Sequence, residues 1–196
     1  MNNIFLETIK AVDGEIYNLS FHQKRYESVL NSLGVLTYKN LHDFLNPPID
    51  GIFRCRLVYT KDKIEVSYHS YTKRSIKTLK LVYENEIEYD KKYADRTKVN
   101  ALFKQREEAD DILIIKNNLV CDTSIANIAF YDGDKWLTPK QPLLKGTTRA
   151  RFLEIGKIFE QDIEVKDLQN YTKVALLNAM IDFDIIATEN IKATFC

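Results

Sequence analysis

The 196-residue sequence contains only three cysteines, Cys55, Cys121 and Cys196, and they lie far apart. An odd number of cysteines without C-x-x-C spacing indicates neither a disulfide framework nor a zinc site, so we predict no metal site. The sequence also lacks an excess of charge, because 28 basic residues balance 28 acidic ones. This balance argues against binding to nucleic acid or to an anionic membrane surface, and a small molecule is the expected ligand.

Glycine and proline are scarce, with six and four residues, and long apolar runs are missing. No run approaches the ~18 apolar residues of a membrane-spanning helix, and the N-terminus has no signal-peptide pattern. The motifs G-x-G-x-x-G, H-E-x-x-H and G-x-S-x-G and the P-loop do not occur. We therefore expect a cytoplasmic protein whose site is built from other elements.

Apolar residues make up 45% of the chain, which is enough for a filled core, and their patterns predict an α+β fold. A hairpin is expected at Asp13-Gly14. A capping box at Ser20 and Gln23 predicts a helix that ends near Gly34. The other elements expected in this part are a short helix at 38–45 and strands at 53–59, 64–68 and 76–83.

The charged segment 85–92 has no apolar periodicity, so it is the predicted linker between domains 1–84 and 93–196. Asn117-Asn118 and Asp132-Gly133 are expected turns in the second domain. The elements expected there are helices at about 95–109 and 148–156 and strands at 112–115, 119–121, 128–131, 135–138, 163–165 and 174–177.

Two stretches are suited to an anion. The hydroxyls of Thr147 and Thr148 can cap the helix expected at 148–156. The N-terminus of this helix favours a phosphate, and Asp122 supplies a carboxylate nearby. His22 and Arg25 lie three positions apart on one helical face, where the arginine can bind an anion in bidentate fashion. Each residue also has a simpler interpretation, as a solvated arginine, a helix cap or a turn residue.

The order and wording of five motifs resemble the class IV aminotransferases, the fold-type IV enzymes that use pyridoxal 5'-phosphate. The family includes branched-chain and D-amino-acid aminotransferases and aminodeoxychorismate lyase. The motifs are Leu6-Glu7-Thr8-Ile9-Lys10, His22-Gln-Lys-Arg25, Lys92-Tyr-Ala-Asp-Arg96, Asp122-Thr-Ser-Ile-Ala-Asn127 and Gly146-Thr-Thr-Arg149.

The resemblance implies two α/β domains, with the cofactor between them, and a homodimer that acts on a small amino substrate. It implies that Lys92, thirty positions before Asp122, is the Schiff-base lysine, with Lys91 and Lys98 as alternatives. Asp122 corresponds to the glutamate that faces the pyridine nitrogen, and Asn127, five positions later, is implied as a further cofactor-binding residue.

The remaining cofactor-binding residues implied by the resemblance hold the phosphate. Arg25 corresponds to the phosphate-binding arginine, and Thr147 and Thr148 to the residues at the helix N-terminus. Asn178 and Ala179 are implied as a further contact.

The sequence departs from the family pattern at several positions. Asp122 is one methylene shorter than glutamate, Asp95 replaces asparagine, Thr147 replaces isoleucine, and the strand before Leu6 is almost absent. Because Asp122 stands where the family has glutamate, an alternative is a descendant of this family that has lost the cofactor and serves as a binding or structural protein.

The Asn178-Ala179-Met180 segment resembles the lyase branch of the family. The implied reaction is therefore pyruvate elimination from 4-amino-4-deoxychorismate, which gives 4-aminobenzoate for folate biosynthesis. Transamination of branched-chain or D-amino acids is the alternative. In either case Lys92 is expected to act as general base and acid.

Overall fold

The computed structural model describes residues 4–187 and 191–196. The chain forms two compact units, the first comprising residues up to Lys73 together with Lys91–Asp95, and the second Arg74–Asp90 together with Arg96–Cys196. This division differs from the predicted domains 1–84 and 93–196 with their linker at 85–92. The reason is β5 (Leu79–Tyr83), which pairs in parallel with β6 (Asp111–Lys116) and so belongs to the second unit.

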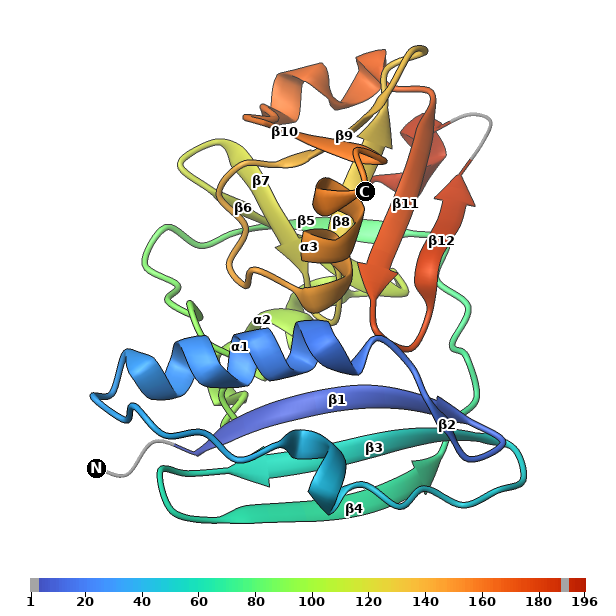
Figure 1. Ribbon diagram of the computed structural model, residues 1–196. Helices are drawn as coiled ribbons and strands as arrows, with labels where there is room; N and C mark the ends of the chain where they lie inside the picture. Colours follow the sequence, from blue (N-terminus) through green and yellow to red (C-terminus); the bar gives the residue numbers. More distant parts are fainter. Residues whose placement is uncertain (1–3, 188–190) are drawn as a thin grey trace. The chain divides into compact units, whose positions relative to one another are not determined.

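The first unit is a four-stranded antiparallel sheet with one helix on it (Figure 1). Asp13 and Gly14 form the predicted hairpin turn, with φ angles of 49° and 84°. The strand order is β2-β1-β3-β4, and the strands are β1 (Phe5–Val12), β2 (Glu15–Ile16), β3 (Ile52–Tyr59) and β4 (Ile64–Ser70).

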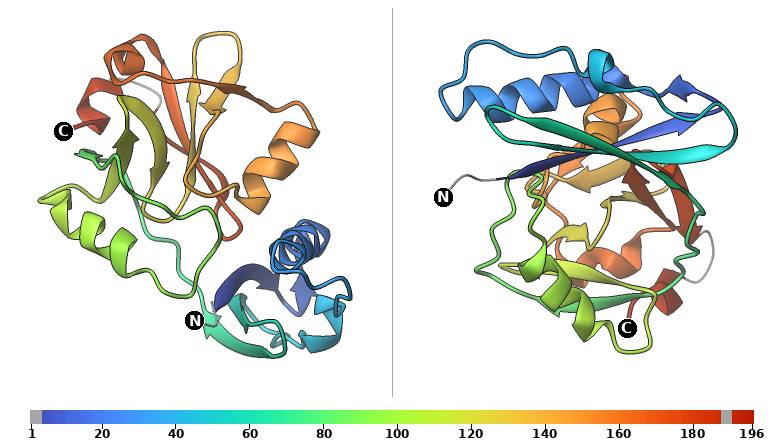
Figure 2. Two further views of the ribbon diagram at one scale, coloured as in Figure 1. Left: turned by 90° about the vertical axis from the view of Figure 1, so that its left-hand side faces the viewer. Right: turned by 90° about the horizontal axis from the view of Figure 1, so that it is seen from below.

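Helix α1 (Leu19–Asn31) packs on this sheet through Tyr26, Val29 and Leu30, which are buried in the first unit's core. Figure 2 shows the helix next to β1, end-on in the left view. The predicted capping box is wrong, because the helix begins after Asn18 without a side-chain cap. Gln23 instead bonds to the backbone of residues 39 and 41, just before the 3-10 helix η1 (Leu41–Phe44).

The second unit contains two sheets (Figure 1). In the three-stranded sheet β6 lies between β5 and β7 (Leu119–Thr123), and Asn117 and Asn118 make the predicted turn with φ angles of 52° and 62°. The five-stranded sheet has the order β10-β9-β8-β11-β12, formed by β8 (Asn127–Tyr131), β9 (Trp136–Pro139), β10 (Ile158–Gln161), β11 (Lys173–Asn178) and β12 (Asp182–Ala187).

The strand predicted at 163–165 is wrong. Ile163 is buried in the core, but Val165 begins the 3-10 helix η3 (Val165–Asn170). The strand lies earlier, at β10, where only Ile158 is buried and Phe159 is 47% exposed. A strand with one buried residue shows no alternation, and β10 is fixed by its parallel pairing with β9.

Helix α3 (Thr147–Glu154) packs Phe152 against buried residues of the five-stranded sheet. It begins one residue earlier than predicted, with Gly146 as N-cap, and no side chain caps it, so the predicted threonine cap is wrong. The predicted helix at 95–109 is shorter than expected and forms α2 (Thr97–Phe103) and η2 (Lys104–Arg106). The 3-10 helix η4 (Ile191–Thr194) ends the chain.

Among residues 4–187 and 191–196, no helix has the length and apolar character needed to span a membrane.

Candidate functional site

A buried ion pair lies at the centre of the first unit. Strand β1 alternates, so Glu7 points to the same face as the core residues Phe5 and Ile9, and it is 0% exposed. Arg25 on α1 donates from Nε to Glu7 Oε1 at 2.7 Å and from Nη2 to Oε2 at 2.5 Å. The bidentate partner of Arg25 in the structure is thus the side chain of Glu7, and the predicted contact of Arg25 with a phosphate stays a prediction.

His22 completes this cluster from the same helical face as Arg25. Its Nδ1 donates to Glu7 Oε2 at 2.6 Å, and the ring is 1% exposed. Burial would raise the pKa of Glu7, but the charge of Arg25 and the hydrogen bonds from both partners lower it to about 2. Burial and the charges of Arg25 and Lys92 lower the pKa of His22, which outweighs the opposing effect of Glu7. The cluster thus holds an ionised acid and a neutral imidazole near neutral pH.

Lys92 belongs to the first unit and lies beside this cluster. The backbone carbonyl of Lys92 accepts from Leu6 N at 2.8 Å, and Tyr93 pairs with Phe5 in an antiparallel bridge. Residues 91–95 therefore run along the outer edge of β1, next to the strand that carries Glu7. The effect of the Lys92 charge on the pKa of His22 reflects this proximity.

Glu7 is a candidate site residue that our sequence analysis did not assign. It was part of a family motif, but no role was given to it. The available signal was an acidic residue at an inward-facing position of an apolar strand, since a buried carboxylate needs a partner. The helical pair His22 and Arg25 supplies that partner.

In the second unit, Asp122 lies on a bulged strand. Leu113 pairs with Thr123 and Ile115 with Val120, so β7 carries one extra residue at Cys121–Asp122. Bulges often redirect a side chain beside a functional site. Asp122 is 5% exposed, and burial raises its pKa to about 7 despite opposing hydrogen bonds and the charge of Arg149.

The carboxylate of Asp122 is held by neutral donors. Asn127 Nδ2 donates to Asp122 Oδ1 at 2.7 Å and to Leu144 O at 2.8 Å, and Leu144 N donates to Asp122 Oδ2 at 2.9 Å. A carboxylate has about four acceptor positions, so these two bonds leave capacity for a further donor. Asp122 and Asn127, which the family resemblance implies as cofactor-binding residues, are therefore in direct contact.

The loop that Asp122 holds leads into the N-terminus of α3. Thr147 and Thr148 are buried in its first turn, where backbone amides and the helix dipole favour an anion. Arg149, in the same motif, turns away from this end. Its Nη2 donates to Pro139 O at 2.8 Å and to Glu160 Oε1 at 2.6 Å, which fastens α3 to β9 and β10.

Asn178 uses its side chain locally at the end of β11. Its Oδ1 accepts from Met180 N at 2.9 Å and from Ile181 N at 3.1 Å, and its Nδ2 donates to Ile125 O at 3.3 Å. The side chain thus orders the turn into β12. A cofactor contact by Asn178 or Ala179 stays a prediction.

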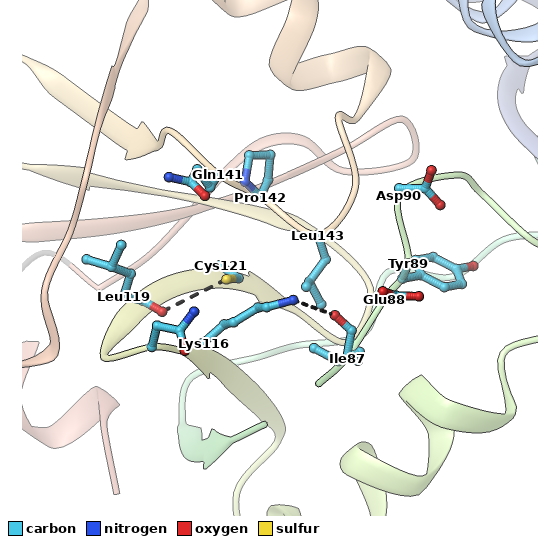
Figure 3. Close-up of a pocket in the computed structure, with 11 residues that line it drawn as sticks. Ile87, Glu88, Tyr89, Asp90, Lys116, Leu119, Cys121, Gln141, Pro142 and Leu143 are labelled. Atoms are coloured by element: carbon cyan, nitrogen blue, oxygen red, sulfur yellow. Dashed lines mark hydrogen bonds between the residues drawn. The ribbon is translucent and has the colours of Figure 1, made fainter. Parts of the chain in front are cut away.

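A pocket of about 490 Å³ opens elsewhere in the second unit (Figure 3). Lys116 reaches across it, and its Nζ donates to Ile87 O at 3.0 Å. Glu88 and Asp90 also line it, so its charges are mixed. None of the predicted site residues lines this pocket, although Leu143 adjoins the loop that Asp122 holds.

The structure thus brings the predicted residues together in two groups, each within one unit. The first unit joins Lys92 and Arg25 to Glu7 and His22, and it offers an amine beside an acid, an imidazole and a guanidinium. The second unit joins Asp122, Asn127 and the start of α3, and it offers a carboxylate and an anion site. Proton transfer and binding of an anion are the chemistry that these groups suit.

Comparison with known proteins identifies relatives of this chain. An uncharacterized protein of Haemophilus influenzae is 37% identical over 180 residues, which are 89% of this chain and 96% of that protein. A crystal structure from Haemophilus somnus 129PT, named provisionally as a 4-amino-4-deoxychorismate lyase, has a TM-score of 0.84 and 36% identity. The match covers 92% of this chain and 97% of that one. A protein of Schizosaccharomyces pombe, named provisionally as an aminodeoxychorismate lyase, is 36% identical over 81 residues, 38% of this chain and 35% of its own.

The family profile described as amino-transferase class IV matches residues 90–186, which contain Lys92, the whole Asp122–Asn127 motif and the start of α3. With this match and the relatives above, the chain belongs to the class IV aminotransferase family.

Proposed function

We propose that this protein is a pyridoxal-phosphate-dependent lyase that eliminates pyruvate from 4-amino-4-deoxychorismate and leaves 4-aminobenzoate, a precursor in folate biosynthesis. The observation that carries this proposal is the similarity to the Haemophilus somnus protein, which extends along 92% of this chain at 36% identity. The family and the site chemistry support the same conclusion.

The residues fit the cofactor because each part of pyridoxal phosphate has a suitable partner. Lys92 supplies the amine, and Asp122 supplies a carboxylate that two neutral donors hold in place. The N-terminus of α3 supplies amides for a phosphate, since no side chain caps it. Thr147, Thr148 and Arg25 are proposed as further phosphate contacts.

When bound, pyridoxal phosphate accepts the electrons released at the amino-bearing carbon of the substrate. Lys92 would hold the cofactor through its Nζ, and the same amine would serve as the base for the proton on that carbon. The neighbouring C–O bond to the enolpyruvyl group breaks and the ring becomes aromatic. The leaving group takes up a proton and becomes pyruvate.

Asp122 and the Glu7 cluster have different roles in this proposal. Asp122 would face the pyridine nitrogen and keep it protonated, because a cation beside the carboxylate favours the ionised form of Asp122. Glu7 stays ionised and balances the charge of Arg25 beside Lys92. The buried, neutral His22 adds no second positive charge to this region.

The test is to incubate the purified protein and pyridoxal phosphate with 4-amino-4-deoxychorismate and to measure pyruvate and 4-aminobenzoate. Equal amounts of both products are expected, and a Lys92→Ala variant should form neither. Amino transfer from branched-chain or D-amino acids to 2-oxoglutarate, without pyruvate release, would contradict the proposal and favour an aminotransferase.

The proposed working form is a homodimer, as the family resemblance implies. Light scattering at micromolar concentration should give twice the mass of the 22.9 kDa chain. A monomeric protein with full lyase activity would contradict this part.

A further inference from the structure

We propose that Asn127 is a positioning residue that joins the carboxylate of Asp122 and the loop at residues 144–146 into one hydrogen-bonded cluster. Through this cluster the acid and the start of α3 are placed together, although they are far apart in the sequence. The inference rests on the proposed function, because it assigns these two groups to opposite ends of the same cofactor.

The cluster is a closed ring of three hydrogen bonds. Asn127 Nδ2 uses both of its protons, one for Asp122 Oδ1 at 2.7 Å and one for Leu144 O at 2.8 Å. Leu144 N closes the ring to Asp122 Oδ2 at 2.9 Å. Asn127 and Asp122 are each 5% exposed, so water does not replace these bonds readily.

Gly146 packs against the other side of the same amide. A Cβ at Gly146 would lie 2.1 Å from Asn127 Oδ1 and 3.3 Å from its Cγ. The φ angle of Gly146 is −68°, which any residue can adopt, so glycine is required here by the close approach to Asn127 and not by the backbone. Gly146 is also the N-cap of α3, so the contact reaches the helix itself.

These contacts indicate that Asn127 acts through Asp122 and the loop and does not bind the cofactor directly. Both amide protons are engaged, and its oxygen faces Gly146. Two charged or titratable groups interact electrostatically with Asp122. The charge of Arg149 lowers the pKa of Asp122, and burial together with the charge of Asp122 raises the pKa of the Cys121 thiol to about 11.

A double-mutant cycle tests the inference. The variants are Asn127→Ala, Gly146→Ala and the combination of both, compared with the parent protein. Thr138→Val is the matched control, because it removes one buried side-chain bond, Thr138 Oγ1 to Ile128 O at 2.8 Å, elsewhere in the same sheet. Three quantities are measured, namely the pKa of Asp122 by NMR, hydrogen exchange of the Leu144 amide and affinity for pyridoxal phosphate.

We expect Asn127→Ala to raise the pKa of Asp122 by about one unit, because a donor to the charged form is lost. Exchange at Leu144 should become faster, and affinity for pyridoxal phosphate should fall about tenfold. Gly146→Ala should act in the same direction by displacing the amide. In the Asn127→Ala background it should have almost no effect, because the group that it displaces is gone.

Additive effects of the two substitutions, or Asn127→Ala values equal to those of Thr138→Val, would overturn the inference. Should Asn127→Ala not fold, Gly146→Ala alone decides, and an unchanged Asp122 pKa and Leu144 exchange rate would overturn it. The pKa and exchange measurements use the cofactor-free protein. If the effects of the two substitutions are coupled but the protein does not bind pyridoxal phosphate, the proposed function is therefore refuted and the inference stands.

Discussion

The two units contain a buried carboxylate each, and the pKa values of the two move in opposite directions. Glu7 is surrounded by Arg25 and His22, and its pKa is lowered to about 2. Asp122 accepts hydrogen bonds from a side-chain amide and a backbone amide, and its pKa is raised to about 7. Both carboxylates are almost fully buried. The difference between their pKa values therefore comes from their charged and hydrogen-bonding partners and not from burial.

The comparison shows what each carboxylate can do. A buried acid with a bidentate guanidinium partner is permanently ionised, and it serves to orient and balance charge. A buried acid with only neutral hydrogen-bond donors is poised near neutral pH and responds to a cation brought next to it. Glu7 is an acid of the first kind and is suited to orienting the residues around Lys92. Asp122 is an acid of the second kind and is suited to pairing with a protonated ring.

The largest expected effect concerns the amine beside the Glu7 cluster. Lys92→Ala should reduce lyase turnover by at least about 10³-fold, because the proposed mechanism uses this amine both to hold the cofactor and to move the proton. Turnover is measured as pyruvate formation. Lys98→Ala is the matched control and should keep the parent activity, and if the two variants behaved alike, Lys92 would have been assigned wrongly.

Neutralising Glu7 should remove the charge pairing with Arg25 that distinguishes Glu7 from Asp122. Glu7→Gln leaves Arg25, whose side chain is only 14% exposed, beside a group without charge, and removal of one partner of a buried pair costs about 3–5 kcal/mol. Urea denaturation measures this loss of unfolding free energy. Glu65→Gln, at an exposed position of β4, should change it by less than about 0.5 kcal/mol. A loss as small as that of the control would contradict the burial of the pair.

The pH dependence of stability should show the two carboxylates acting in opposite directions. The folded pKa of Glu7 lies below its ordinary value of 4.5, so its contribution, about 3 kcal/mol, is present above pH 4.5 and is lost as pH falls towards 2. The folded pKa of Asp122 lies above 3.8, so ionisation destabilises the fold, by up to about 4 kcal/mol, as pH rises from about 4 to 7.

Asp122→Asn should remove the second effect and leave the first. Unfolding free energies measured from pH 4 to 8 should then be flatter in the variant than in the parent protein. A variant that kept the full decline between pH 4 and 7 would show that another group is responsible.

A third carboxylate gives the smallest effect. Glu160 is half-exposed and bonds to the buried Arg149 at 2.6 Å. Because water screens this pair on one side, Glu160→Gln should lower the unfolding free energy by only about 1 kcal/mol. A loss as large as that of Glu7→Gln would mean that charge pairing outweighs burial in setting these energies.

The sequence predicted those parts of the fold and site that depend on local chemistry. The turns at Asp13-Gly14 and Asn117-Asn118 were correct because they depend on positive φ angles. The family motif named Asp122 and Asn127 but did not predict the hydrogen bond between them. Glu7, in contrast, gains its role from residues on α1, and no local pattern shows that pairing. The strand β10 and the placement of β5 depend on parallel partners, which periodicity does not identify.

The most direct test of the central claim is to add pyridoxal phosphate to the protein, reduce it with borohydride and locate the modified lysine by peptide mass spectrometry. We predict one stable modification per chain, on Lys92, and none in the Lys92→Ala variant. Modification of Lys91 or Lys98 instead, or a protein that takes up no cofactor, would contradict the account.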